Sequence, residues 1–488
     1  MSYDSYERKQ SAYAKEQGWE YLVAGEFRRS QEPLAVHSPY DGALVGITSI
    51  PTAADVEEAV GRAQEAFKSL AGLPTYRRAE ILRALAAGVE ARQEEFVRLL
   101  ALEVGKPVKA GAVEVQRAVF NLRYAAEEAQ RLVHEFIPLD LVPAGEGRWG
   151  IVRRFPLGPV LAITPFNFPV NLVVHKLAPA LAVGNSLLVK PSPRAPLCTL
   201  LLGEIAVKAG LPPGALSVLP CSLAQTERLV QHERFKMLTF TGSAAVGWKL
   251  KALAGKKRVA LELGGNAAAI VCSDAELELA AARCAAGGFS YAGQSCISVQ
   301  RIFVHRPVYK DFLERLVAQA SSLRVGNPLD ETTDVGPLIT ADDARRVAAW
   351  VSEAVQGGAK IVVGGKREGS IYYPTVLVAT QPEMRVNSEE IFAPVVTAEP
   401  YDTFAEALAR ANASPYGLQA GVFTRDITAV FQAFETLEVG GVVVNDVPTF
   451  RVDHMPYGGT KDSGLGREGV RYAMEEMTER RILVLSWP

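Results

Sequence analysis

The chain has 488 residues, of which 48% are hydrophobic and 22% are charged, and its formal net charge is −2 at pH 7. This composition is typical of a globular protein with enough chain for two or three domains. A nearly neutral charge balance argues against nucleic acid or a membrane surface as the main partner, because both favour a strongly basic face.

The N-terminal segment and the cysteines indicate the compartment. No apolar run reaches the ~18 residues of a membrane span, and the start, MSYDSYERKQ, has no basic region followed by an apolar one. We therefore expect neither a membrane span nor a signal peptide. The five cysteines are widely spaced without a CxxC pair, and the six histidines are scattered. These features predict a cytoplasmic, reduced protein with no metal site.

The elements are predicted from the periodicity of apolar residues. Residues 54–135 read as helices, because ADVEEAVGRAQEAF and YRRAEILRALAAGVEARQEEFVRLLALEV carry apolar residues at i, i+3, i+4 and i+7. Gly105 and Pro107 close the second pattern. From about Val160, short apolar runs alternate with helical patterns, in VLAIT, SLLVK, LSVLP, KMLTF and VALEL. Such alternation predicts βαβ units, a parallel sheet, right-handed connections, and ligands beyond the carboxyl ends of the strands.

A second alternating series runs from about residue 267 to residue 446. Its predicted strands are AAAIVC, RIFVH, KIVVGG, AGVFT and GGVVVND. The two series together predict an α/β fold with two domains. The last residues, RRILVLSWP, form an isolated apolar strand that would have little to pair with at the end of a domain. An exposed edge of this kind is usually covered, often by another subunit.

One of the five cysteines has different surroundings from the others. Cys198, Cys272 and Cys284 lie in apolar helix-like or strand-like patterns, and Cys221 lies in the turn LPCSLAQ. A free cysteine is more often a small buried hydrophobe than a nucleophile, and these four fit that role. Cys296 lies in SYAGQSCISVQ, a glycine-containing loop with small and polar neighbours. This setting favours a nucleophile displayed on a loop.

Polar residues at predicted strand ends suggest a binding edge. KMLTFTGSAAVGWKL places Gly242 and Ser243 in a turn before a helix, whose free N–H groups suit a phosphate. The spacing is not GxGxxG, so an ordinary capped turn is an equal alternative. Lys190 ends the strand SLLVK, where it would either reach a ribose or phosphate or simply be solvated.

Two further residues have surroundings that suit catalysis. Glu262, in VALELGGN, lies in an apolar strand that runs into two glycines. A carboxylate there is either paired in a buried salt bridge or has a raised pKa, as a general base requires. Asn167, in ITPFNFPV, follows another strand between two prolines. A rigid loop that holds an amide donor suits oxyanion stabilisation, although asparagine is also common in ordinary turns.

From about residue 20 to the C-terminus, the chain closely resembles the aldehyde dehydrogenase superfamily. TPFNFP, LLVKPSP, FTGSAAVG, LELGG, GQSC and EEIFAPV occur in the family's order and spacing, and MPYGGTKDSGLGREG matches as well. The resemblance implies two Rossmann-like parallel-sheet domains and a small β extension that joins subunits of a homodimer or homotetramer. The implied divisions are a cofactor-binding domain (1–130 and 150–262), a catalytic domain (263–446) and an oligomerisation segment (131–149 and 470–488).

The resemblance also assigns catalytic roles. Cys296 would attack the aldehyde carbon as a thiolate, and its backbone N–H and the Asn167 amide would hold the oxyanion. Hydride would pass to the nicotinamide, and Glu262 would activate the water that hydrolyses the thioester to a carboxylic acid. Lys176, in VVHKLAPAL, matches a family lysine near the active site that would support Asn167.

Cofactor contacts follow from the same resemblance. Glu390 and Phe392, in EEIFAPV, match positions that hold the nicotinamide ribose and flank the ring. Family members that prefer NAD often carry a glutamate three residues after the lysine of LLVKPSP, where this chain has Pro193 followed by Arg194. Without that carboxylate both NAD and NADP stay open, with NAD slightly ahead. Five other positions fall on cofactor motifs: Thr164, Pro165, Lys190, Gly242 and Ser243.

The substrate is predicted from two further segments. FNLRYAAEEAQRLVHEF and PTFRVDHMPYGG resemble the branch of lactaldehyde and non-phosphorylating glyceraldehyde-3-phosphate dehydrogenases. Arg123 and Arg451 align with arginines that bind the substrate phosphate in the latter, which implies a small hydroxylated or anionic aldehyde. Phosphate-specific members tend to have arginine just before the nucleophile, whereas this chain has Ser295. A structural role for both arginines is an equal alternative.

Two other functions are open at this point. A coenzyme A-acylating semialdehyde dehydrogenase would pass the thioester to a thiol, but that branch generally lacks the glutamate found here as Glu262. A catalytically silent relative would serve as a binding or structural protein, but such relatives usually lose the cysteine found here as Cys296.

Overall fold

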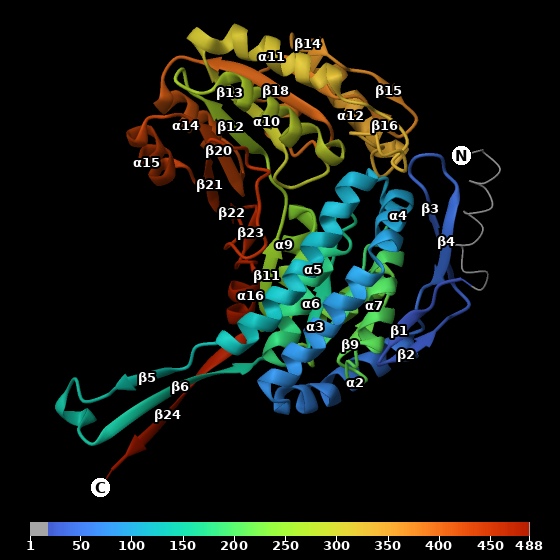
Figure 1. Ribbon diagram of the computed structural model, residues 1–488, viewed down its shortest axis with the longest axis vertical. Coiled ribbons are helices and arrows are strands. Elements are labelled where there is room, and N and C mark those ends of the chain that lie inside the picture. The colour runs from blue at the N-terminus through green and yellow to red at the C-terminus, as the bar shows by residue number, and fades with distance from the viewer. Residues whose placement is uncertain (1–17, 488) are drawn as a thin grey trace.

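The computed structural model describes residues 18–487, so the N-terminal segment MSYDSYERKQ, from which we expect no signal peptide, lies outside the described residues. The predicted α/β architecture is confirmed. Two largely parallel sheets, each with its own helices, lie one above the other, and a slender β arm projects from the lower one (Figure 1). Within residues 18–487, no helix combines the length and apolarity needed to cross a membrane.

The first sheet contains all five strands predicted between residues 160 and 262, and these five are parallel to one another. Its outer strands were not predicted, and β1 and β23 pair antiparallel with their neighbours. The pairing of β23 places Gly464 opposite Glu262 and so brings the C-terminal part of the chain to that carboxylate. In spatial order the strands are β2 (Glu26–Arg28), β1 (Tyr21–Val23), β9 (Leu216–Val218), β8 (Leu187–Lys190), β7 (Val160–Ile163), β10 (Met237–Thr241), β11 (Arg258–Glu262) and β23 (Gly464–Leu465).

The helices around this sheet follow the predicted pattern with one break. The long second pattern divides at Arg92 into two helices, α3 and α4, and α4 ends at Gly105. Gly105 has φ 67°, and a Cβ there would lie 2.5 Å from Pro337 Cγ, so glycine is required. The helices are α2 (Ala53–Gly72), α3 (Thr75–Ala91), α4 (Gln93–Val104), α5 (Val108–Arg131), α6 (Asn171–Val183), α7 (Leu197–Lys208), α8 (Leu223–Gln231), α9 (Ala244–Leu253) and α16 (Val470–Glu476).

The second sheet contains the five predicted strands and two that were not predicted, β17 and β18. β18 lies beside β13 in the middle of the sheet, although it contains Pro400, and an internal proline usually argues against a central strand. β14 is antiparallel to β17, and the other strands are parallel. In spatial order they are β14 (Lys360–Val363), β17 (Thr375–Val378), β18 (Val395–Tyr401), β13 (Val299–His305), β12 (Ala267–Val271), β20 (Gln419–Phe423) and β21 (Gly441–Val444).

Helices cover both faces of the second sheet (Figure 1). Ala269 and Val271 of β12 belong to a core shared with α10, α11 and α12, whereas Ala268 and Ile270 belong to a core shared with α14 and α15. This alternation follows from the two-residue period of a strand. The helices are α10 (Leu277–Phe289), α11 (Tyr309–Ser322), α12 (Ala341–Gln356), α13 (Arg385–Ser388), α14 (Phe404–Asn412) and α15 (Ile427–Thr436).

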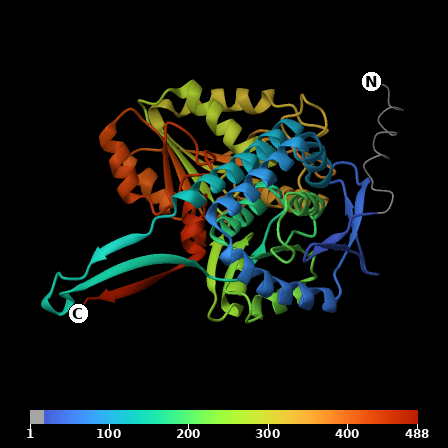
Figure 2. The same cartoon turned by 60° about the horizontal axis from the view of Figure 1, so that its bottom comes forward.

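The arm is an antiparallel sheet in the order β24-β6-β5, and Figure 2 shows it extending away from both domains. Its strands are β5 (Glu135–Pro138), β6 (Arg148–Pro156) and β24 (Thr478–Ser486). The expectation that the terminal strand has little to pair with is wrong, because β24 pairs with β6 from Thr478 to Ser486. The helix α16 packs on α5 and α6 instead of joining the arm.

The remaining elements are short. They are β3 (Pro33–His37) and β4 (Leu44–Ser49), β15 (Arg367–Glu368) and β16 (Ile371–Tyr372), β19 (Tyr416–Gly417) and β22 (Thr460–Lys461), and the 3-10 turns η1 (Pro143–Gly145), η2 (Ser290–Gly293) and η3 (Arg306–Val308).

Candidate active site

A strained turn presents Cys296 between the two sheets. Tyr291, Ala292 and Gly293 all have left-handed backbone angles, with φ 50°, 53° and 68°. Such angles cost a non-glycine residue of order 1 kcal/mol or more, and functional loops are where this strain is commonly found. No residue with a side chain fits at position 293, because a Cβ there would lie 2.2 Å from the Ala393 carbonyl oxygen. Cys296 is only partly buried, unlike three of the other four free cysteines.

Asn167 lies beside this turn, in the loop that follows β7. Its Nδ2 donates to the carbonyl oxygen of Gln294 at 3.0 Å, and its buried Oδ1 has no partner within residues 18–487. A side-chain amide has two N–H donors, so the second remains available for an oxyanion. Lys106 Nζ donates to the Asn167 carbonyl oxygen at 2.6 Å and lies 3.6 Å from the centre of the Phe168 ring.

The structure corrects the contact expected of Lys176. This lysine does not support Asn167, since its Nζ donates to Thr239 Oγ1 and to Glu468 Oε1, both at 3.0 Å. Lys106 instead makes the contact with Asn167. The reason is topological: α6 starts at the Asn167 loop but carries Lys176 inward over the sheet. Lys176 therefore belongs to the charged groups around Glu262.

Glu262 ends β11 and is 5% exposed. No ion pair involves it within the described residues, and its Oε2 is buried without a hydrogen-bond partner. Burial raises the pKa of Glu262 well above the ordinary value; the carboxylate of Glu468 adds to the rise, and the cations of Arg451 and Lys176 oppose it. A carboxyl group in this environment takes up a proton at a higher pH than an exposed carboxyl group does.

The two glycines after Glu262 allow three chain segments to meet. A Cβ on Gly264 would lie 2.3 Å from Glu390 Oε2, and one on Gly265 would lie 2.1 Å from the Cys296 carbonyl oxygen. Gly265 N donates to Glu390 Oε1 at 2.9 Å. Burial raises the pKa of Glu390 to about 7. The glycine pair thus brings the ends of the two predicted motifs, LELGG and EEIFAPV, against the cysteine loop.

Phe392 lies next to this junction. Its backbone has φ 51°, and its ring meets that of Phe166 edge to face, with centroids 6.1 Å apart. Two aromatic rings from different domains thus lie together near the cysteine, where a flat apolar ring could stack.

The carboxyl edge of the first sheet carries unsatisfied polar groups. Thr164 Oγ1, Thr241 Oγ1 and Trp248 Nε1 are buried without a partner within residues 18–487. Ser243 precedes α9, but its side chain makes no capping bond. Lys190 ends β8, and burial lowers its pKa. Hydroxyls, a lysine and an uncapped helix start at one strand edge fit a ligand that carries phosphates and ribose hydroxyls.

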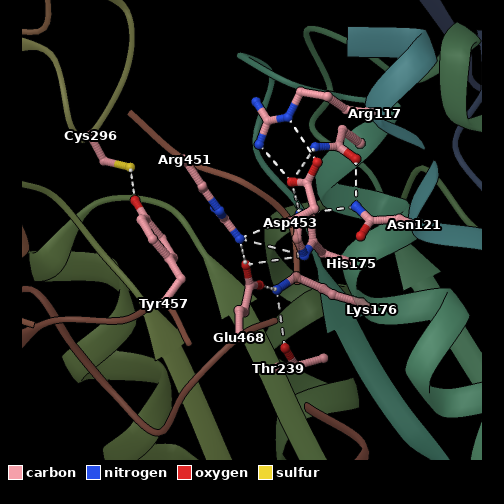
Figure 3. A network of polar contacts seen from close by, with 11 residues as sticks. Arg117, Asn121, His175, Lys176, Thr239, Cys296, Arg451, Asp453, Tyr457 and Glu468 are labelled. Carbon is pink, nitrogen blue, oxygen red and sulfur yellow. Dashed lines mark hydrogen bonds and ion pairs between the residues drawn. The ribbon is translucent and has the colours of Figure 1, made fainter. Parts of the chain in front are cut away.

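Arg451 lies in a buried polar cluster that Figure 3 shows beside the cysteine. Its guanidinium lies 3.6 Å from the centre of the Tyr457 ring, and its Nη2 donates to Glu468 Oε2 at 3.0 Å. The Arg451 Nε is buried without a partner in the described chain. Tyr457 Oη lies 3.1 Å from Cys296 Sγ. Arg451 is therefore linked through a tyrosine to the cysteine and through Glu468 to Lys176.

Asp453 organises the other half of this cluster. Arg117 donates to both of its oxygens, at 2.9 and 2.6 Å, and His175 Nε2 lies 2.8 Å from its Oδ1. Burial alone would raise the pKa of Asp453, but His175 and Arg117 bring it well below its usual range. Arg451 Nη2 lies 3.4 Å from His175 Nε2, which joins the two halves.

Arg123 is not brought into this cluster. Its side chain is half exposed and its Nη2 donates to Glu90 on α3 at 2.6 Å. Arg117 lies six residues earlier on α5, about 240° around the helix, and reaches the cluster instead. Sequence reasoning also missed His175, Asp453, Tyr457 and Glu468. The last two lie in MPYGGTKDSGLGREG, a segment matched as a motif without roles for its residues, and no local pattern distinguishes any of the four.

A cysteine loop, an amide donor and a buried carboxyl group meet between two parallel sheets, as oxidation of an aldehyde through a covalent thioester requires. The chain belongs to the aldehyde dehydrogenase family, whose model matches residues 27–483. It is thus an oxidoreductase that acts on aldehydes.

Relatives with named substrates are similar over nearly the whole chain. A 3-sulfolactaldehyde dehydrogenase of Priestia megaterium is 46% identical, over 95% of this chain and 97% of the relative. Aldehyde dehydrogenase 21 of Physcomitrella patens, in complex with the reaction product succinate, is 43% identical with a TM-score of 0.94, over 96% and 98% of the two chains. A glyceraldehyde-3-phosphate dehydrogenase of Methanocaldococcus jannaschii, complexed with NADP, is 39% identical with a TM-score of 0.89, over 94% and 100%. The last of these agrees with the branch expected from the sequence.

Proposed function

We propose that this protein oxidises a small hydroxylated or anionic aldehyde to its carboxylic acid with NAD(P)+, through a thioester on Cys296. The observation that carries the proposal is the meeting of three groups: the Cys296 loop, the Asn167 amide 3.0 Å from that loop's Gln294 oxygen, and Glu262 without an ion-pair partner in the described chain. The first supplies a nucleophile, the second an oxyanion donor and the third a general base.

The chain's own residues account for the covalent steps. The Cys296 thiolate forms a bond to the aldehyde carbon, and the backbone N–H of Cys296 with the second amide N–H of Asn167 holds the oxygen that becomes negative. NAD(P)+, when bound, accepts the hydride that leaves this carbon, and a thioester remains. Glu262 then takes a proton from a water whose oxygen adds to the thioester carbon. The C–S bond breaks, the acid is released and Cys296 leaves as thiolate.

NAD and NADP both suit the residues of the cofactor edge. Lys190 and the start of α9 would hold the adenosine side and the phosphates, and Glu390 and Phe392 the nicotinamide side. Pro193 and Arg194 follow Lys190, so no carboxylate there would repel a 2′-phosphate. The NADP complex of the Methanocaldococcus relative supports the use of NADP as an alternative to NAD.

The substrate class is supported by the relatives and by the arginine cluster. The Priestia relative is named for 3-sulfolactaldehyde, the Physcomitrella relative was solved with succinate, and the Methanocaldococcus relative is named for glyceraldehyde 3-phosphate. These compounds carry a sulfonate, two carboxylates and a phosphate. The buried Nε of Arg451 has no hydrogen-bond partner among residues 18–487, so one more charge-assisted hydrogen bond can form there. We therefore propose that Arg451 binds the anionic group of the substrate and that Arg117 lies nearby. We give Arg123 no part, because it is paired with Glu90.

We also infer a cytoplasmic homodimer or homotetramer. The arm leaves large apolar side chains exposed, and burial of such a surface between subunits is favourable. These exposed side chains are Phe136, Trp149, Ile482, Leu483, Val484 and Trp487. The five cysteines are free, as in a reducing compartment.

The proposed activity is tested by the absorbance of NAD(P)H with a panel of aldehydes, with each cofactor, and with and without coenzyme A. We expect a carboxylic acid product, no dependence on coenzyme A, and the highest kcat/KM for an aldehyde with a remote anionic group. A rate that requires coenzyme A would support the acylating alternative, and no turnover with any aldehyde would support the silent relative.

A further inference from the structure

The cysteine nucleophile has a hydroxyl neighbour to which the mechanism above gives no role. Tyr457 Oη lies 3.1 Å from Cys296 Sγ, within hydrogen-bond reach for a sulfur acceptor (Figure 3). Either atom can be the donor while Cys296 is a thiol. No other hydrogen bond is formed by this hydroxyl within residues 18–487, and the tyrosine is 3% exposed, so water has little access to it. Among the described residues, Cys296 is therefore the hydrogen-bond partner of the Tyr457 hydroxyl.

Three kinds of contact hold the Tyr457 ring in place. Its backbone forms an isolated antiparallel bridge with Glu468, in which Tyr457 N donates at 3.1 Å and Glu468 N donates at 2.6 Å. The ring packs with Ile297 and Leu418 in a small apolar cluster that also contacts Cys296. The Arg451 guanidinium covers the ring at 3.6 Å. A ring fixed in this way cannot turn its hydroxyl from the sulfur without breaking other contacts.

The direction of the hydrogen bond follows from the reactive state of the cysteine. The nucleophile is the thiolate, which has no proton and can only accept, so the phenol must be the donor when Cys296 is ready to attack. Hydrogen bonds to a charged acceptor are stronger than those to a neutral one, and such a bond favours the charged form. The cation above the ring also polarises the hydroxyl and makes it a better donor.

The pKa of Cys296 depends on burial and on the charged groups around it as well as on Tyr457. Burial raises the pKa of Cys296 to about 12; the Tyr457 hydrogen bond lowers it, the Glu390 and Glu262 carboxylates raise it, and Arg451 lowers it. Glu262, Arg451 and Cys296 are also the charged or titratable groups that face Tyr457, and burial raises the pKa of Tyr457 well above its ordinary value. The phenol thus stays protonated and can donate throughout.

We propose that Tyr457 is a positioning residue for the nucleophile: its hydroxyl donates a hydrogen bond to Cys296 Sγ, favours the thiolate and fixes the sulfur for attack. The inference rests on the proposed role of Cys296 in aldehyde oxidation. The thiol proton leaves to solvent before attack, and Tyr457 keeps its own proton. When the C–S bond forms, the sulfur loses its charge and the hydrogen bond weakens; it strengthens again when the thioester is hydrolysed.

The test is the rate at which iodoacetamide alkylates Cys296, followed by mass spectrometry of the peptide that contains it, over a range of pH and without aldehyde. We expect Tyr457→Phe to displace the pH profile upward by roughly one unit and to lower the rate constant at pH 7 about tenfold, as the loss of a hydrogen bond to a charged group implies. We expect a comparable fall in kcat/KM, with unchanged binding of NADP measured by fluorescence.

Tyr401→Phe is the matched control. Tyr401 is 2% exposed, and its hydroxyl lies 3.5 Å from Cys272 Sγ, so the same atom is removed beside a cysteine in no catalytic position. We expect the Cys296 profile of this variant to match that of the wild type. Coincident profiles for Tyr457→Phe and the wild type would overturn the proposal, and so would equal displacements in both variants.

A second variant serves if Tyr457→Phe melts at a much lower temperature than the wild type. Replacement of Tyr457 alone by 3-fluorotyrosine keeps the ring and hydroxyl but makes the phenol a stronger donor. The alkylation profile should then move downward in pH, and an unchanged profile would overturn the proposal. Because alkylation needs neither aldehyde nor hydride transfer, its outcome is separate from that of the proposed function, which fails if a Cys296→Ala variant keeps its turnover.

Discussion

Gly265 and Cys296 are in such close contact that a single added carbon would separate them: a Cβ on Gly265 would lie 2.1 Å from the Cys296 carbonyl oxygen. The strand that ends in Glu262 therefore reaches the nucleophile's loop only because glycines follow it. The contact fixes where Glu262, the proposed general base, lies relative to the Cys296 thiol.

We expect Gly265→Ala to move the Cys296 loop and to destabilise the protein by about 1–3 kcal/mol, the usual cost of overpacking. Thermal melting and kcat should both fall. The matched control is Gly72→Ala at the end of α2, because a Cβ there would meet no atom of the described chain within 4 Å. If Gly265→Ala keeps wild-type kcat, the close approach is not needed for catalysis.

Cys296→Ser should abolish oxidation while the fold and cofactor binding survive, because a serine hydroxyl is not ionised at this position as a thiol can be. Steady-state NAD(P)H formation measures the loss, and circular dichroism and cofactor fluorescence measure what remains. The control is Cys221→Ser, at a buried cysteine for which the mechanism has no role. Turnover above a few per cent of the wild-type rate in Cys296→Ser would contradict the assignment.

Glu262→Gln should still form the thioester and release one equivalent of NAD(P)H as a burst, and then stall, because no base remains to activate water. Stopped-flow absorbance separates the burst from the steady state. A normal steady-state rate would show that another group activates water. The absence of a burst would place Glu262 in the first half-reaction.

The difference in stability between the wild type and this variant should depend on pH in a definite direction. The folded protein raises the pKa of Glu262 above its usual 4.5, so the carboxyl group binds its proton more tightly in the folded than in the unfolded chain. The contribution of this tighter proton binding to the free energy of unfolding is fully present below pH 4.5 and is lost as the pH rises toward the folded-state pKa. Glutamine does not ionise, so the melting temperature of the wild type should fall relative to that of Glu262→Gln over this range. Parallel curves would mean that the pKa of Glu262 is not raised.

Arg451→Ala should damage turnover of glyceraldehyde 3-phosphate or succinate semialdehyde far more than turnover of propanal. Loss of one charge-assisted contact costs roughly 1.5–3 kcal/mol, or about ten- to a hundredfold in kcat/KM. The ratio of kcat/KM between substrates is the measurement, since contact with Tyr457 and Glu468 gives Arg451 a structural role as well. An equal fall for all three aldehydes would leave Arg451 only that structural role.

Arg123→Ala addresses the other aligned arginine. Its half-exposed ion pair with Glu90 is worth at most about 1 kcal/mol. We expect no change in the substrate ratio, measured with the same three aldehydes. A selective loss with the anionic aldehydes would return Arg123 to the substrate site.

A chain that ends at Arg481 should have a smaller assembled mass than the full protein, because it lacks the second half of β24, where the exposed Ile482, Leu483 and Val484 lie. Light scattering measures both masses. The full chain should give a multiple of 52.6 kDa. A full chain that scatters as a monomer at micromolar concentration, or a truncated chain with an unchanged assembly state, would contradict the interface.

Much of the fold could be predicted from local sequence, because alternation of apolar runs depends on neighbours in the chain. The five strands from Val160 to Glu262 are of this kind. β18 was not predicted; it contains Pro400, which argues against a central strand, and the packing of the sheet overrides that local preference. The partner of β24 also depends on a distant segment.

In the candidate site, too, some features follow from local sequence and others from contacts between distant segments. The sequence by itself determined which residues are proposed to carry the chemistry: Cys296 by its small and polar loop, Glu262 by its apolar strand, and Asn167 by its prolines. Only the tertiary structure decided their partners. In the folded chain Lys106 contacts Asn167, and Lys176 contacts Glu468. Arg117, and not Arg123, lies in the cluster with Asp453, and the Tyr457 hydroxyl contacts Cys296. The physical reason is that a residue's type and near neighbours limit what it can do, whereas each of these four contacts joins segments 61 to 336 residues apart, whose distances only packing fixes.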